Sequence, residues 1–534
     1  MVSLWGSRSA GDHGRAEADS PPDEDGVRDR SSARVDDAEE ANERTHLLPP
    51  PTHASYLDPD DPAVSPYNLW SVRALRYFSI LFLVITFLWW VLLFISIFIS
   101  PPGMHSRGSG FFDVSYTTLT LGNLLIGILF FASPSRAARI SCLIIAVLLL
   151  VDMIIIVAVS RLRFEEGWVG VTSVVWALLM ALWILLTDRV VAWGKHEEEE
   201  RLTGRRETRR TLREWCSVLS SNVVLALLII VTILLSAVLI LRARDATLAP
   251  PGERYYVDGN KYQVHVFCEG NITSSHGKRN PTVFLEGGEE PVEQGLLPFA
   301  ANALKNGTIS RYCYWDRPGL AWSDNAPSPH SAGMSADALS EALARAGEEG
   351  PWVLVAAGIG GIYSRIFSAR HTREVQGLLL IDTLHEDLLH RIASPSRGFL
   401  LWARGIISPL GFDRLAGALF RGRSREDRTY GKSASQGGRF LKAKLQENLV
   451  ADSLTKSEVS SARTIQSDAM PLVVLSSGIE VRRDSEWERK QRDLTHLTNH
   501  LVAWDIINGA PHEVWQTLTG REVMEKRLGA LVHP

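Results

Sequence analysis

Cysteine is scarce in this sequence, and charges of the two signs are almost balanced. The 534 residues include 4 Cys, and 56 Lys or Arg stand against 60 Asp or Glu, which gives a net charge of −4. So few cysteines exclude a small disulfide-dense fold, and the charge balance excludes a basic nucleic-acid-binding protein. No pair of cysteines has the spacing of a metal site, so we expect neither a metal nor a cofactor.

Long apolar runs are missing from the first 65 residues, which hold six Arg and fifteen Asp or Glu. Such a segment cannot bury enough apolar surface to offset the entropy of ordering, so we predict that 1–65 is a disordered acidic tail. It has neither the pattern of a signal peptide nor that of a mitochondrial presequence. Glu43, Leu47 and Leu48 resemble an acidic dileucine sorting signal, which a sorting adaptor would bind; the alternative is a chance match.

Long apolar runs do fill residues 70–245, the predicted transmembrane domain. Five of them approach the roughly 20 residues that a helix needs to cross a bilayer. They lie near 79–100, 116–133, 140–159, 168–187 and 222–241. The second run is the shortest, and without it the chain would cross four times.

Basic residues favour one side of these runs. The segment 188–220 carries eight Lys or Arg and lies on the same side as Arg73, Arg76, Arg136 and Arg139, which favours the cytosol for this side and for the N-terminus. Five spans then place the residues after about 245 in a lumen, where Asn271 and Asn306 begin N-glycosylation patterns. We predict an endomembrane protein of the vacuole or lysosome, with a mitochondrial membrane as the alternative.

Asp152 lies inside the third apolar run. An embedded carboxyl marks either an ion path or a hydrogen bond between helices. One acid without other embedded charges favours the hydrogen bond. A transport or channel role for the membrane helices is therefore the weakest of the functions that the sequence allows.

From residue 250 to 534 the pattern changes to short apolar runs that alternate with amphipathic stretches. Helices are expected at 335–347 and 361–370, among others. Strands are expected at 253–257, 261–267, 282–286, 311–315, 352–356, 376–381, 471–476 and 501–506. This alternation predicts a mainly parallel sheet covered by helices on both faces.

Motifs in this region resemble those of the α/β-hydrolase fold family, in the same order. The resemblance covers roughly 253–530 and implies that fold, with a helical cap near 388–468. Its motifs are the segment after the fourth strand at 314–324, the strand–elbow–helix at 353–361, the sixth strand with its acid at 377–387, the next strand at 470–475, and the histidine loop at 508–512.

The resemblance implies a catalytic triad from which one member is missing. Relatives carry Ser, Asp or Cys at the centre of the elbow, and Gly358 stands there in this chain. His512 takes the place of the general base and Asp382 that of the carboxylate that orients it. The resemblance assigns the oxyanion region to Gly287, Gly288 and Ile359.

The sequence as a whole leaves three functions open. The first is a pseudoenzyme whose domain binds an apolar small molecule or a protein, since glycine cannot form an acyl-enzyme. The second is an active hydrolase, esterase- or lipase-like, that uses the His–Asp pair with an unconventional nucleophile such as Ser364. The third is the transport role of the membrane helices.

The fold resemblance also brings two cysteines together. In α/β-hydrolases the second strand runs antiparallel beside the fourth, which puts Cys268 opposite Cys313. We predict a disulfide with a Cα–Cα distance of about 4.4–6.8 Å, which would suit an oxidising lumen. The alternative is two buried thiols.

Overall fold

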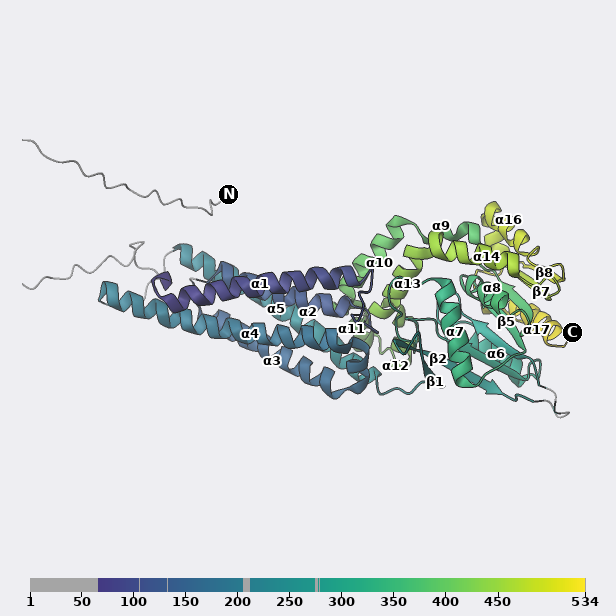
Figure 1. Ribbon diagram of the computed structural model, residues 1–534, viewed down its shortest axis with the longest axis horizontal. Helices are drawn as coiled ribbons and strands as arrows, with labels where there is room; N and C mark the ends of the chain where they lie inside the picture. Colours follow the sequence, from purple (N-terminus) through teal and green to yellow (C-terminus); the bar gives the residue numbers. More distant parts are fainter. Residues whose placement is uncertain are drawn as a thin grey trace, which may run out of the picture. The chain divides into compact units, whose positions relative to one another are not determined.

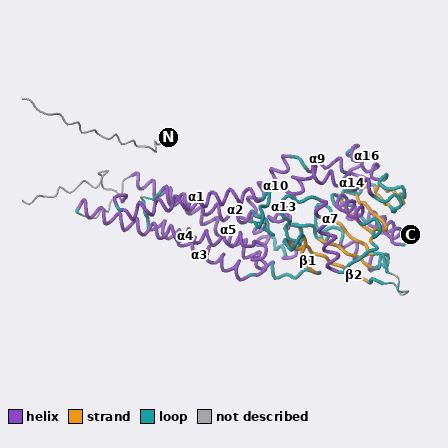
Figure 2. The backbone as a smooth tube through the Cα atoms, viewed as in Figure 1, coloured by secondary structure: helices purple, strands orange, loops and turns teal. Residues whose placement is uncertain are grey.

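The computed structural model describes residues 66–104, 106–131, 133–204, 212–273, 277 and 279–533. The predicted acidic tail, with Glu43, Leu47 and Leu48, lies outside these ranges. The strands all belong to the C-terminal half of the chain (Figure 2).

Within the described residues, five helices are long and apolar enough to cross a membrane. They are α1 (Trp70–Ser96), α2 (Phe111–Leu129), α3 (Arg136–Ala158), α4 (Ser160–Thr203) and α5 (Leu212–Asp245), and Figure 1 draws them side by side. A short 3-10 turn, η1 (Pro66–Asn68), precedes α1.

The ends of these helices differ from the predicted spans. α1 and α2 stop at Ser96 and Leu129, about four residues before the predicted ends, because the chain turns ahead of prolines at 101 and 134. α4 does not stop at 187. It continues through the charged segment, whose residues are good helix formers, to Gly204 at φ 70°, which ends it.

Asp152 on α3 is fully buried and joined to two other helices. Its Oδ2 accepts hydrogen bonds from the Tyr116 hydroxyl on α2 at 2.9 Å and from the Ser236 hydroxyl on α5 at 3.0 Å. These hydrogen bonds between three helices explain the buried carboxyl of Asp152 by helix packing, without an ion path.

The C-terminal half forms an eight-stranded sheet in the order β1-β2-β4-β3-β5-β6-β7-β8. β2 runs antiparallel to β1 and β4, and the other pairs are parallel, as the resemblance to α/β-hydrolases implied. The strands are β1 (Glu253–Val257), β2 (Tyr262–Gly270), β3 (Thr282–Glu286), β4 (Arg311–Trp315), β5 (Trp352–Ala357), β6 (Val375–Ile381), β7 (Leu472–Ser477) and β8 (Leu501–Ile507). The predicted fold class is confirmed.

Helices cover both faces of this sheet because its side chains alternate between two apolar cores. One core includes Phe284 and Leu354, and the other includes Val283 and Val355. The helices on the first face are α7 (Ala332–Ala346), α8 (Gly360–Arg370) and α14 (Lys456–Ile465), and those on the second are α6 (Leu297–Lys305) and α17 (Leu518–Val532). Two short helices, α15 (Gly478–Arg483) and α16 (Ser485–Leu494), follow β7, and the 3-10 turn η6 (Val514–Gln516) follows β8.

The segment predicted as the cap lies between β6 and β7 and is helical. Its elements before α14 are η2 (Glu386–Leu388), α9 (Leu389–Ile392), α10 (Pro395–Ile407), η3 (Ser408–Leu410), α11 (Phe412–Phe420), α12 (Arg425–Thr429), η4 (Ala434–Gln436), α13 (Gly438–Val450) and a π-helical turn (Ala451–Thr455). α14 packs on α8 in the core of the domain, whereas α10 contacts α2, and α11 and α12 contact α5.

The contact between the cap and the membrane helices is close. A methyl group added at Gly405 of α10 would come within 2.2 Å of the Phe111 ring of α2. Several large apolar side chains of α10 and α11 remain exposed beside this contact: Phe399, Leu400, Ile407, Phe412, Leu419 and Phe420. An apolar surface of this kind, next to helices that cross a membrane, is suited to lie against lipid.

Candidate active site

Gly358 occupies the sharp turn between β5 and α8, with φ at +52°. A Cβ built on this glycine would lie 3.2 Å from Nε2 of His512 and 3.4 Å from the Cα of Gly288. The residue that would carry a nucleophile therefore faces the imidazole, as the resemblance implies, but it has no side chain.

His512 and Asp382 form a close pair. The ring Nδ1–H donates to Oδ2 of Asp382 at 2.6 Å. Asp382 is fully buried, and its Oδ1 accepts from the Ser477 amide at 3.0 Å and from the Trp487 indole at 2.9 Å. These bonds fix the carboxylate, which in turn leaves Nε2 of His512 turned toward Gly358.

The charge of Asp382 controls the protonation of His512. Burial lowers the pKa of His512, but the hydrogen bond and the charge of Asp382, aided by Glu513 and Glu480, outweigh burial and raise it above its ordinary value. A raised pKa makes the ring a better proton acceptor, which is the property that a general base needs.

Ser364, the candidate unconventional nucleophile, lies in the interior of the domain. It is buried on α8 and lines a small cavity with Phe284, Glu286 and Trp315. In the part of the chain that the structure describes, no serine, threonine or cysteine side chain is hydrogen-bonded to the His512 ring.

The turn predicted as the oxyanion region lies beside Gly358. Gly288 adjoins Gly358, and Ile359 directly precedes α8, so its amide belongs to the N-terminal end of that helix. The carbonyls of Gly287 and Gly288 accept hydrogen bonds from the Arg317 guanidinium, the first at 2.6 Å. Arg317 thus fixes the turn rather than reaching a substrate.

Arg317 belongs to a buried network of charges that sequence reasoning did not identify. Its guanidinium bonds to Glu286 at 2.9 Å, lies 3.8 Å from Glu447, and sits 4.6 Å above the Tyr363 ring. Burial raises the pKa of Glu286 to about 7, against the attraction of Arg317. The one available signal is Glu286 itself, an acid at the end of a fully buried strand.

Two acids, Glu289 and Glu290, follow the turn, and an unpaired carboxylate there would oppose a developing negative charge. Glu289 pairs with Lys444 at 3.0 Å and with Arg397 at 3.4 Å, so its charge is neutralised. Burial acts to raise its pKa, but Lys444 and Arg397 hold the pKa of Glu289 at about 2. Burial and the charge of Glu513 raise the pKa of Glu290.

Two groups of described residues bring three potential metal ligands within 4.8 Å. One contains the disulfide cysteines and Glu348, which pairs with Arg311 at 2.7 Å. The other is His265, Glu293 and Asp316, in which Nδ1 of His265 bonds to Asp316 at 2.8 Å. Burial and the neighbouring charge of Asp316 raise the pKa of Glu293 well above its ordinary value, which favours its protonated form.

Cys268 and Cys313 are opposite each other on β2 and β4 and form a disulfide. Their Cα–Cα distance is 4.1 Å, slightly shorter than the expected range. The pairing is the antiparallel one that the resemblance implied.

The two candidate glycosylation sites differ in their surroundings. Asn271 is exposed after the end of β2. The Asn306 amide donates to Glu525 at 2.9 Å, and the hydroxyl of Thr308, which completes the pattern, donates to the same carboxylate at 2.6 Å. Asn271 is therefore the more accessible acceptor.

One relative covers nearly all of the chain. An uncharacterized protein of Schizosaccharomyces pombe is 36% identical over 531 residues, which span 93% of this chain and 98% of the relative. The chain belongs to the family of this protein. Residues 39–268 also match a family model described as a region of unknown function, DUF2417.

A second relative supplies a location. An uncharacterized vacuolar membrane protein of Saccharomyces cerevisiae is 27% identical over 384 residues, or 61% of this chain and 59% of the relative.

Among solved structures, a carboxylesterase of Nitrososphaera gargenis covers 52% of this chain and 98% of its own length, with 14% identity and a TM-score of 0.38.

Proposed function

We propose that the C-terminal domain is a hydrolase fold that no longer forms an acyl-enzyme and that binds a small apolar molecule or a partner protein at a vacuolar-type membrane. The observation that carries this proposal is the geometry at Gly358, where the position facing His512 has no side chain. Loss of the nucleophile of a triad costs on the order of 10⁶ in turnover.

The orientation of the chain is part of this proposal. The disulfide between Cys268 and Cys313, the exposed Asn271 and the location of the Saccharomyces cerevisiae relative all support a lumenal C-terminal domain. The basic segment after the fourth span supports a cytosolic N-terminus.

A second candidate function rests on the His–Asp pair, which keeps the bond expected of a working base. With Asp382 at 2.6 Å, His512 could remove a proton from water, and the water would then attack an ester directly. No covalent intermediate forms in such a reaction.

Two measurements on the purified full-length protein separate these functions. An alkyl fluorophosphonate should leave the wild-type mass unchanged, and an adduct on any described serine would contradict the first function. Hydrolysis of p-nitrophenyl esters should be equal in wild type and His512→Ala. A rate that falls about 100-fold or more in the variant would favour direct attack by water.

A further inference from the structure

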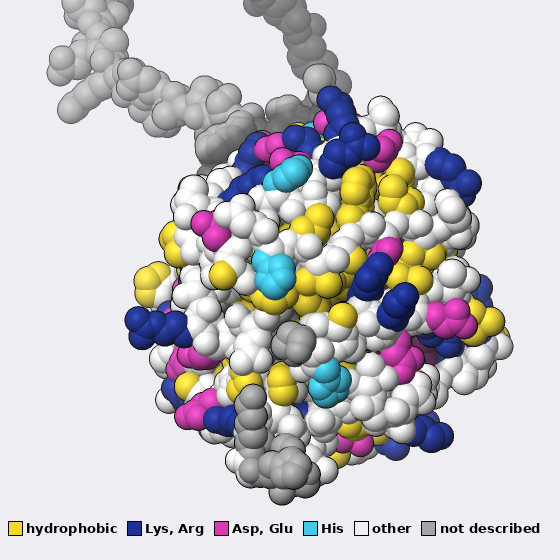
Figure 3. All heavy atoms as spheres, turned by 90° about the vertical axis from the view of Figure 1, so that its right-hand side faces the viewer, with side chains coloured by type: hydrophobic (Ala, Val, Ile, Leu, Met, Phe, Trp, Pro, Cys, Tyr) yellow, Lys and Arg dark blue, Asp and Glu magenta, His cyan; other side chains and the backbone are white. Residues whose placement is uncertain are grey.

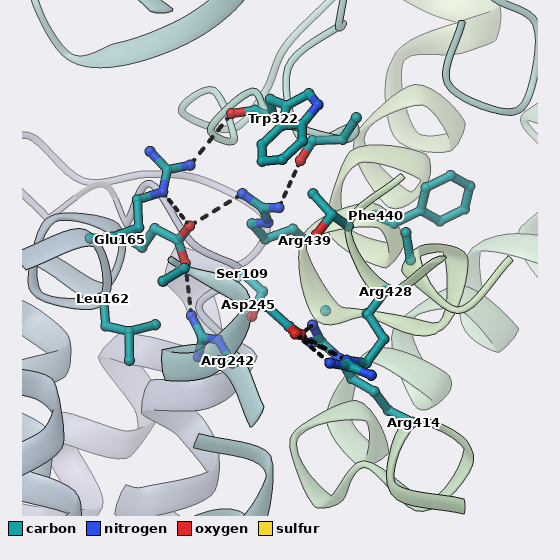
Figure 4. Close-up of a pocket in the computed structure, with 18 of the residues that line it drawn as sticks. Ser109, Leu162, Glu165, Arg242, Asp245, Trp322, Arg414, Arg428, Arg439 and Phe440 are labelled. Carbon is teal, nitrogen blue, oxygen red and sulfur yellow. Dashed lines mark hydrogen bonds and ion pairs between the residues drawn. The ribbon is translucent and has the colours of Figure 1, made fainter. Parts of the chain in front are cut away.

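A pocket of about 150 Å³ lies where the membrane helices meet the C-terminal domain. Its walls come from the ends of α2, α4 and α5, from β1 and the loop after β4, and from η3 and the cap helices α11, α12 and α13 (Figure 4). Gly358, His512 and Asp382 are not among its lining residues, so the pocket is separate from the candidate active site.

Arginines outnumber acids around this pocket, although Glu166 and Asp324, which are not among its lining residues, also pair with Arg242 and Arg161. Two carboxylates line it, those of Glu165 and Asp245. Six guanidinium groups line it, those of Arg161, Arg242, Arg254, Arg414, Arg428 and Arg439. On the outer face drawn in Figure 3, by contrast, basic and acidic side chains are interspersed.

Each carboxylate is shared among several arginines. Asp245 receives Arg428 in a two-pronged contact at 2.6 and 3.0 Å and Arg414 at 3.0 Å. Glu165 receives guanidinium groups at 2.9, 3.0 and 3.3 Å from Arg161, Arg242 and Arg439, respectively. Figure 4 shows these two groups, each centred on one acid.

Some of the arginines keep donors that the described chain does not satisfy. Among the described residues, Arg254 has no ion-pair partner, and its Nη1 is buried without a hydrogen bond. Nη1 of Arg161 and Nε of Arg414 are also buried without a hydrogen bond, although both of these arginines have ion-pair partners. A buried donor without an acceptor is costly, so these groups point to an acceptor supplied from outside the chain.

Arg414 is both buried and close to other positive charges. Burial, the largest cause, together with the charges of Arg242 and Arg439 lowers the pKa of Arg414 to about 10, against the attraction of Asp245. An anion in the pocket would relieve this repulsion.

The remaining lining indicates what kind of anion fits. Phe112, Leu162 and Val238 add apolar surface from the ends of three membrane helices. Forked guanidinium groups match the geometry of phosphate oxygens better than they match a spherical ion. Apolar wall and arginines together suit a phosphate attached to a hydrocarbon chain.

We propose that this pocket binds a phosphate group, at the junction of the membrane helices and the C-terminal domain. The phosphate could belong to a lipid headgroup or to a water-soluble compound, since both present the same oxygens. The site stands independently of whether the hydrolase-like domain retains catalysis.

The test uses the full-length protein in a maltoside detergent, which carries no phosphate. Thermal unfolding is followed with short-chain phosphatidic acid, with the matching diacylglycerol, with inorganic phosphate, and with chloride at equal ionic strength. A ligand that binds only the folded state raises Tm, so phosphatidic acid should raise it and diacylglycerol should not.

The decisive variant is Arg254→Gln, because the described structure gives Arg254 no ion pair whose loss would unfold the chain. Removing one charged donor should weaken the binding of phosphatidic acid about tenfold. Arg414→Gln should act in the same direction. Arg492→Gln is the matched control, because that arginine is exposed on α16 and pairs with Glu488.

The pattern of stabilisation identifies the source of the phosphate. Stabilisation by phosphatidic acid alone supports a lipid headgroup, and stabilisation by inorganic phosphate as well supports a soluble phosphate ligand. The proposal is overturned if neither compound raises Tm above the chloride control, or if Arg254→Gln binds phosphatidic acid as tightly as Arg492→Gln does.

Discussion

Gly358 carries its backbone at φ +52°, a conformation open to glycine at little steric cost. The elbow of active hydrolases holds its nucleophile in a similarly strained turn. The geometry of the turn is thus present in this chain, while the side chain that would use it is absent. The partners that surround it, His512 and Asp382, are fully in place.

A prediction about pH follows from the raised pKa of His512. Because the folded-state pKa lies above the unfolded value, the pair with Asp382 stabilises the fold fully below the unfolded pKa and loses this effect as pH rises through the folded pKa. Wild type should therefore exceed His512→Gln in Tm by more at pH 5.5 than at pH 8.5. The check is thermal unfolding at both pH values, and an equal difference would count against the pair.

The oxyanion turn is the element whose stability depends most on a buried charge. Arg317 holds the turn by its carbonyls and also neutralises Glu286. Arg317→Met would leave the buried Glu286 without its counter-charge and with the Trp315 indole as its remaining hydrogen-bond donor, and we expect a loss of about 3–5 kcal/mol. Thermal unfolding of the single variants and of the Glu286→Gln/Arg317→Met double variant measures this.

The double variant is the internal control for that prediction. Once Glu286 is neutral, losing Arg317 should cost much less, so the two changes should not be additive. Additive losses would mean that Arg317 acts through its bonds to the turn alone.

Elements of this fold were predictable to within a few residues where apolar runs end at Gly, Pro or charged residues. β3 at 282–286 and β4 at 311–315 have the predicted bounds. The predicted end of the fourth span at 187 is not the end of α4. The segment after 187 is charged but consists of good helix formers, so its composition indicates where the membrane ends and not where the helix ends.

Sites built from distant residues were less predictable. The positions of Gly358, Asp382 and His512 in the site were predictable, because the resemblance to α/β-hydrolases assigns each of them to one motif along the chain. The arginine pocket draws on six residues between 161 and 439, and no local pattern links them. Only the packing of cap on membrane helices brings them together.

At the scale of the whole molecule, the orientation in the membrane can be read from one glycan. Asn271→Gln should abolish a gel shift produced by enzymatic deglycosylation, because Asn271 is exposed. Asn306→Gln should have a smaller effect, because Glu525 holds both polar groups of that pattern. A wild-type protein without a glycan would argue against a lumenal domain.

The disulfide gives an independent prediction for the same compartment. A bridge across 45 residues of sequence should add roughly 4 kcal/mol to the stability of the domain. Cys268 and Cys313 should react with a maleimide in denatured cell extracts only after reduction, and the Cys268→Ser/Cys313→Ser variant should unfold at a lower temperature. Reaction without reduction would contradict an oxidising compartment.

We propose that the candidate active site lacks a nucleophile and little else. Gly358→Ser places a hydroxyl beside Nε2 of His512, at a strain of about 1–2 kcal/mol that Gly358→Ala shares and therefore controls. The intact mass of each protein after treatment with an alkyl fluorophosphonate is the direct measurement. We predict one adduct per chain in Gly358→Ser, and none in wild type, Gly358→Ala or Gly358→Ser/His512→Ala; a folded Gly358→Ser protein without an adduct, or a wild-type protein with one, would contradict the account.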